Sequence, residues 1–109
     1  MNVYAIPEVI DDLEHLIDIL YDKGYFGCEE SSIDYVVDLF NEILNKLPYR
    51  LKKRAPKYFE KYGEGLYYAV FPKSKRTQWY VFFKIYRLNG ELHYQVRHIT
   101  NNHIVAQYL

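Results

Sequence analysis

The C-terminal third of the chain carries residue types that could move a proton beside a phosphate group. His98 and His103 flank residues 99–102, a segment typical of a tight turn, so Arg97 and His103 are expected to approach each other. Histidine transfers protons near neutral pH, and arginine can stabilise the charge of a pentavalent phosphate transition state. Metal-free RNA cleavage by the ribose 2′-hydroxyl needs both functions. The simpler alternative is that residues 99–103 only form and cap a turn.

The remaining reactive residues match no catalytic or metal-binding pattern. The chain has no glycine-rich phosphate loop, no GxSxG sequence and no HExxH sequence. Its single cysteine, Cys28, has no base near it in sequence and belongs to no Cys/His spacing suited to structural zinc. We therefore predict neither a metal site nor a cofactor, and a reducing, cytoplasmic location.

The length and composition indicate one domain that spans all 109 residues. Hydrophobic residues make up 50 % of the chain, which is enough for a packed core. Acidic residues interrupt the most apolar stretch, so no run approaches the ~18–20 residues of a membrane span, and the N-terminus does not resemble a signal peptide. We expect no association with a membrane.

The zero net charge conceals two oppositely charged halves. Residues 1–47 hold eleven acids and two bases, a net charge of −9, whereas residues 48–109 hold three acids and twelve bases, a net charge of +9. The basic half could face the phosphates of a nucleic acid. Alternatively, the two halves simply neutralise each other across the fold.

The spacing of apolar residues predicts a helical hairpin near the N-terminus. A short extended piece, Val3–Ile6, precedes Pro7, which favours the first turn of a helix. Apolar residues then recur at helical spacing up to Gly24, and again from residue 33 to 47, where Pro48 ends the second helix. Two amphipathic helices joined by a short loop should pack antiparallel.

The second half of the chain predicts strands. After one or two helical turns that follow Pro56, β-branched and aromatic residues predict four strands, with an Asn89-Gly90 hairpin turn between the second and the third. The short connections imply an antiparallel meander. The predicted fold is α+β, an N-terminal helical hairpin packed on one face of a twisted antiparallel sheet. The four strands are Leu66–Phe71, Gln78–Tyr86, Leu92–Ile99 and His103–Tyr108.

Alternation along the strands divides their side chains between two faces. Trp79, Val81, Phe83 and Ile85 should face the helices. The outward face would then be basic and aromatic, a combination that suits single-stranded RNA because bases stack on rings and phosphates bind cations. The alternative is that these are ordinary strand-forming and solvent-facing residues. The candidate RNA-binding residues are Lys73, Lys75, Tyr80, Lys84, His93 and Gln95.

Three segments resemble the RelE/ParE superfamily of bacterial toxins. Residues 3–13 (VYAIPEVIDDL) are similar to that family's first strand, proline and acidic helix. Residues 75–83 (KRTQWYVFF) resemble a strand that carries a substrate-binding arginine, and residues 96–103 (VRHITNNH) resemble a closing strand and turn that hold a histidine. The order of elements is similar over nearly the whole chain.

The resemblance implies a single RelE/ParE-like domain, the toxin of a type II toxin–antitoxin system. Such a toxin cleaves mRNA on the ribosome and is silenced by a cognate antitoxin. By position, His103 would transfer the proton and Arg76 and Arg97 would bind phosphate, supported by Lys73 and Lys75, with Tyr108 as an aromatic residue near the C-terminus.

Two alternatives accompany this prediction. The neutral net charge and acidic first half also fit a ParE-like member, which inhibits DNA gyrase by protein binding and has no nuclease site. A small interaction module without toxic activity is the second alternative.

Overall fold

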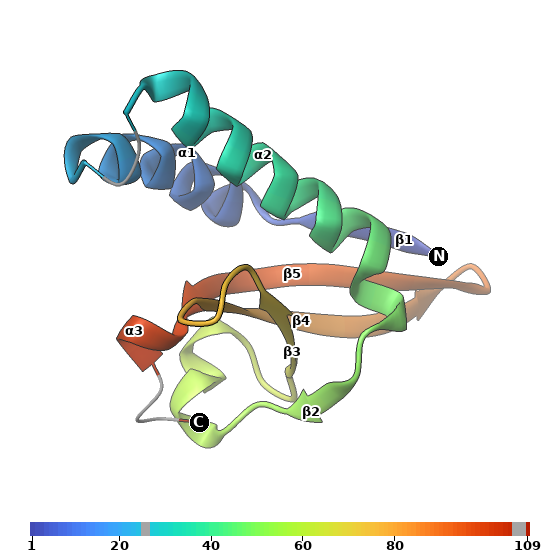
Figure 1. Cartoon of the computed structure of the whole chain (residues 1–109). Coiled ribbons are helices and arrows are strands. Elements are labelled where there is room, and N and C mark those ends of the chain that lie inside the picture. The colour runs from blue at the N-terminus through green and yellow to red at the C-terminus, as the bar shows by residue number, and fades with distance from the viewer. Residues whose placement is uncertain (25–26, 106–108) are drawn as a thin grey trace.

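The chain forms two layers, a helical hairpin and a five-stranded sheet, with a short 3₁₀ helix on the sheet's other face (Figure 1). The computed structural model describes residues 1–24, 27–105 and 109. Its elements are β1 (Asn2–Ala5), α1 (Pro7–Asp22), α2 (Glu29–Lys46), the 3₁₀ helix η1 (Leu47–Tyr49), β2 (Lys52–Arg54), the 3₁₀ helix η2 (Lys57–Tyr62), β3 (Tyr67–Pro72), β4 (Gln78–Leu88), β5 (Glu91–Asn101) and α3 (Asn102–Val105).

The α+β class and the packing of helices against the sheet are confirmed, but the predicted antiparallel sheet is wrong. The strand order is β1-β5-β4-β3-β2, and β1 pairs in parallel with β5. The helical hairpin is also not the N-terminal element, because β1 precedes it and Pro7 carries the chain directly into α1. Strands β2 to β5 are mutually antiparallel, and β1 adds to the outer edge of β5 in the parallel direction, so the sheet is mixed.

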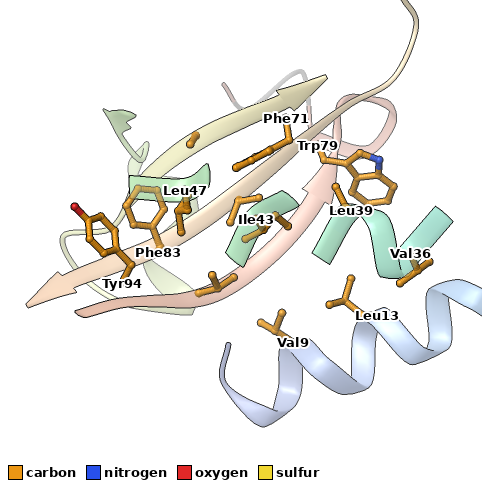
Figure 2. Packing of buried hydrophobic residues seen from close by; sticks show 13 residues of the cluster. Val9, Leu13, Val36, Leu39, Ile43, Leu47, Phe71, Trp79, Phe83 and Tyr94 are labelled. Atoms are coloured by element: carbon orange, nitrogen blue, oxygen red, sulfur yellow. The ribbon is translucent and has the colours of Figure 1, made fainter. Parts of the chain in front are cut away.

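The main core lies between the helical hairpin and the sheet (Figure 2). Trp79, Val81 and Phe83 face the helices as predicted, and all three are buried. Trp79 also donates a hydrogen bond from Nε1 to the Tyr35 hydroxyl of α2, at 2.9 Å. The helices contribute Val9, Leu13, Val36, Leu39 and Ile43 to this core.

A β-bulge interrupts the pairing of β4 with β5. Phe82 lies opposite His98, whereas Phe83 lies opposite Val96, so Arg97 is an extra residue in β5. A bulge bends its strand and redirects the side chains beside it. Both Arg97 and His98 contact Tyr62 of η2.

A second, smaller core covers part of the outward face of the sheet. Phe59 of η2 stacks on Phe82 of β4 with 4.2 Å between the ring centroids, and both rings are fully buried together with Leu66. The alternation pattern suggested an outward face that is open to a ligand along its whole length. The structure shows instead that η2 covers part of this face. The segment that covers it was predicted only as one or two helical turns.

The prediction of a fourth strand at His103–Tyr108 is wrong for residues 103–105, which the structure describes as part of a short helix. β5 continues to Asn101, whose neighbour Thr100 still pairs with Tyr80, so no tight turn forms at residues 99–102. The chain instead enters α3, where Asn101 Oδ1 accepts a hydrogen bond from the His103 backbone N–H at 3.0 Å. An asparagine at this position favours a helix start, and residues 106–108 lie outside the described part of the chain.

Candidate functional site

The start of α3 is attached to the loop between β3 and β4. Asn102 uses both ends of its side-chain amide: Nδ2 donates to the Arg76 carbonyl at 3.1 Å, and Oδ1 accepts from the Gln78 backbone N–H at 2.9 Å. These two bonds join segments that lie 24 and 26 residues apart in the sequence. We call the group formed by Lys75, Arg76, Thr77, Asn102 and His103 the sheet-end cluster.

His103 is exposed and its ring is oriented by one contact to the loop. Its Nε2 atom lies 3.3 Å from Thr77 Oγ1, and the hydrogen can come from either side. The loop itself is held by Ser74, whose hydroxyl accepts the backbone N–H groups of Arg76 and Thr77 at 3.3 and 3.1 Å. Thr77 was not among the predicted site residues, because it lies 26 positions from His103 in the sequence and no local pattern signals their contact.

Two exposed cations accompany the imidazole. Lys75 and Arg76 precede Thr77 on the same loop, and both side chains are exposed. A solvent-accessible imidazole can take up a proton, and a cation of the same loop can balance negative charge that develops on a phosphate. The backbone of the loop at Arg76 and the start of α3 are neighbours through the Asn102 hydrogen bond, and the joint role of His103 and Arg76 stays a prediction.

Arg97 does not join this cluster by the predicted turn. The four steps of extended β5 from Arg97 to Asn101 span about 13 Å. The guanidinium is occupied instead: Nε donates to the Tyr62 carbonyl at 2.9 Å, and Nη1 donates to Gln95 Oε1 at 3.1 Å. The Arg97 side chain therefore links η2 to β5 by hydrogen bonds.

Three of the predicted RNA-binding residues lie together, away from His103. Lys84 pairs with Gln95, and Tyr86 pairs with His93, on adjacent strands. The His93 ring stacks on Tyr86 at 5.1 Å and contacts Tyr4 of β1 edge-on at 5.9 Å. We call these five residues the outer-face patch. Six steps of β4 separate Gln78 at the sheet end from Lys84, about 20 Å.

The other predicted site residues have different surroundings. Lys73 lies 3.2 Å from Glu42 of α2, which also binds Arg50 at 3.2 Å. Burial raises the pKa of Glu42, but hydrogen bonds from Lys73 and Arg50 and the positive charges of Lys73 and Lys46 outweigh burial and lower the pKa overall. Tyr80 donates to Gln78 Oε1 at 3.3 Å. Tyr108 lies outside the described residues.

His98 was treated only as a neighbour of the expected turn, yet it is the histidine most affected by the fold. Its ring stacks on Tyr62 with 3.7 Å between centroids. Burial lowers the pKa of His98 below its ordinary value, and the charge of Asp12 offsets only part of this effect. The folded protein thus favours the neutral imidazole.

This shift makes stability depend on pH. The unfolded chain binds a proton at His98 near pH 6.5, whereas the folded protein does so only at lower pH. Acidification from about pH 7 to pH 5 therefore stabilises the unfolded state, and the free energy of unfolding should fall. Urea titrations of the wild type and His98→Phe across this range should show a smaller fall for the variant. An equal fall in both proteins would contradict this assignment, and His103→Ala controls for the loss of any histidine.

Comparisons with known proteins identify no relative of this chain. No family model, no curated protein and no solved structure matches the chain. Within the part of the chain that the structure describes, no three His, Cys, Asp or Glu side chains gather as metal ligands. No helix in the same part is both long enough and apolar enough to span a bilayer.

Proposed function

We propose that this protein is a RelE-like toxin that cleaves mRNA in the ribosomal A site and is silenced by a cognate antitoxin. One observation carries the proposal: the exposed imidazole of His103 is held by Thr77 on a loop that also bears Lys75 and Arg76. This is a proton-transfer group beside cations, the combination that RNA cleavage without a metal requires.

In the proposed reaction, His103 removes the proton of a ribose 2′-hydroxyl through Nδ1, while Nε2 donates its hydrogen to Thr77 Oγ1. The 2′-oxygen attacks the adjacent phosphorus, the bond from phosphorus to the 5′-oxygen breaks, and solvent protonates the leaving oxygen. The products are a 2′,3′-cyclic phosphate and a 5′-hydroxyl. Arg76 and Lys75 balance the additional negative charge of the pentavalent transition state, and Thr77 restricts rotation of the imidazole.

The outer-face patch supports binding of an unpaired RNA strand. His93 and Tyr86 provide a stacked pair of rings, and Lys84 is an exposed cation on the same strand as Tyr86. Bases stack on such rings without strong sequence preference, while the cation contacts the backbone. In this proposal the patch holds RNA about 20 Å from the cleavage point, on the other side of the covered stretch around Phe82.

Primer-extension mapping of mRNA in a translating bacterial extract tests the proposal. The wild type should produce cuts in phase with codons, and Arg76→Ala should reduce cutting roughly 100-fold, since it removes charge stabilisation of the transition state. Arg87→Ala removes an exposed arginine of the β4–β5 hairpin and should cut like the wild type. Message that stays intact with the wild-type protein would overturn the nuclease proposal.

A ParE-like gyrase inhibitor is the second candidate. It is favoured by the internal contacts of Arg97 and Lys73, which occupy two of the cations expected at a nuclease site. If this candidate is right, purified protein should lower gyrase supercoiling while mRNA stays intact. Unchanged supercoiling together with intact mRNA would leave the non-toxic interaction module.

A further inference from the structure

The two edges of the sheet differ in how well they are protected from pairing with a strand of another chain. At one edge, β2 exposes Lys52, Lys53 and Arg54, and such charges discourage another strand from pairing. At the other edge, β1 pairs only with residues 93–96 of β5. The Ile6 backbone N–H then donates to the Val96 carbonyl at 3.1 Å, after which the chain leaves the sheet for α1.

This departure leaves the last part of β5 open along one side. Residues 98–101 pair with β4 and Arg97 is the bulge residue, and no described strand adjoins the other edge of residues 97–101. A strand edge that lacks a partner presents backbone N–H and C=O groups, which can bind another extended chain. Ile99, Thr100 and Asn101 carry no charge that would oppose such pairing.

A pocket of about 340 Å³ lies at this open edge, between α1 and η2. Its lining includes His98, Ile99 and Thr100 from β5, Tyr62 from η2, and Leu16 and Asp12 from α1. A strand added beside β5 would thus lie between a helix and an aromatic wall. Its side chains would point alternately to these two sides.

We propose that the open edge of β5 binds an extended basic peptide segment by strand addition. Backbone pairing with residues 97–101 would supply affinity, and apolar side chains of the peptide would pack beside Tyr62 of η2 while the alternate basic side chains face Asp12 of α1. The inference stands apart from the nuclease proposal, because the pocket and the sheet-end cluster share no residue.

The basic character of the partner follows from the charge of α1. Asp11, Asp12, Asp18 and Asp22 are exposed on this helix, and none takes part in the two ion pairs found among the described residues. Asp12 itself lines the pocket, so a lysine or arginine of the partner could pair with it. A second copy paired through the same edge would instead bring two acidic α1 helices together, which disfavours that arrangement.

A fluorescein-labelled nine-residue peptide of alternating lysine and valine is the probe. We expect saturable binding by fluorescence anisotropy, weakened about tenfold by Asp12→Lys, because attraction becomes repulsion at the pocket. Asp34→Lys makes the same charge change on the exposed surface of α2 and should bind within about twofold of the wild type. A peptide of alternating glutamate and valine should bind at least about tenfold more weakly.

Two further measurements separate strand addition from simple charge attraction. Methylation of alternate backbone nitrogens keeps the peptide's charge but prevents pairing, so one of the two methylation registers should lose binding. Hydrogen exchange should slow at residues 97–101 when the unmethylated peptide binds. The proposal is overturned if both methylated peptides bind fully, if exchange at 97–101 is unchanged, if the two charge-reversed proteins bind alike, or if the open edge is occupied by a second copy.

Discussion

His103→Ala should lower codon-phased mRNA cleavage at least about 100-fold while the thermal midpoint stays close to that of the wild type. The loss of activity follows from removal of the proposed general base. Stability should be preserved because the His103 side chain is exposed and makes one hydrogen bond, to Thr77. Primer extension measures the cuts, and differential scanning calorimetry measures the thermal midpoint.

Two companion variants make this result interpretable. Thr77→Val keeps the imidazole but removes its hydrogen-bond partner, so cleavage should fall to an intermediate level, about tenfold. Asn41→Ala changes an exposed position on α2, and its cleavage should match the wild type. If His103→Ala cut as well as Asn41→Ala, the imidazole would have no part in the reaction.

Phe59→Ala should lower the free energy of unfolding by about 3–5 kcal/mol, the largest stability effect that we expect from a residue outside the main core. Phe59 is fully buried and stacks on Phe82 at 4.2 Å, so alanine would leave a cavity between η2 and the sheet. Urea unfolding followed by tryptophan fluorescence and circular dichroism measures this change.

The size of the replacement separates packing from other effects. Phe59→Leu retains most of the apolar volume and should cost less than about 1.5 kcal/mol. Tyr49→Ala removes an aromatic ring that is 77 % exposed and should change stability by no more than about 0.5 kcal/mol. A loss for Phe59→Ala as small as that for Tyr49→Ala would show that η2 does not pack on β4 in solution.

Much of the local structure follows from the sequence. Helical spacing of apolar residues predicted α1 and α2, and alternation predicted β3, β4 and β5 to within two residues at each end. The predicted hairpin turn is confirmed, since Asn89 and Gly90 adopt φ angles of 51° and 81°, a conformation these residue types tolerate. Strand β2 was missed because its three residues, Lys-Lys-Arg, lack the composition of a strand.

The candidate site was predicted only in part. His103 was singled out by its chemistry and Arg76 by the family resemblance, and the contacts that join α3 to the loop run through Thr77 and the Arg76 backbone carbonyl. Arg97 was assigned to the same site because a turn was expected after it. In the structure β5 does not turn there, because it continues to pair with β4 as far as Asn101. Whether an asparagine-rich segment turns or pairs depends on the neighbouring strand, which lies elsewhere in the sequence.

Taken alone, the sequence determined α1, α2, β3, β4 and β5, the hairpin turn and the residue types available for chemistry, because these depend on spacing and conformational preference over a few neighbouring positions. Tertiary structure alone decided that β1 pairs in parallel with β5, that Phe59 covers Phe82, and that Thr77 meets His103. Each of these contacts joins residues more than 20 positions apart. Alternation assigns a side chain to a face of the sheet, but what covers that face is settled by the packing energy of the whole chain.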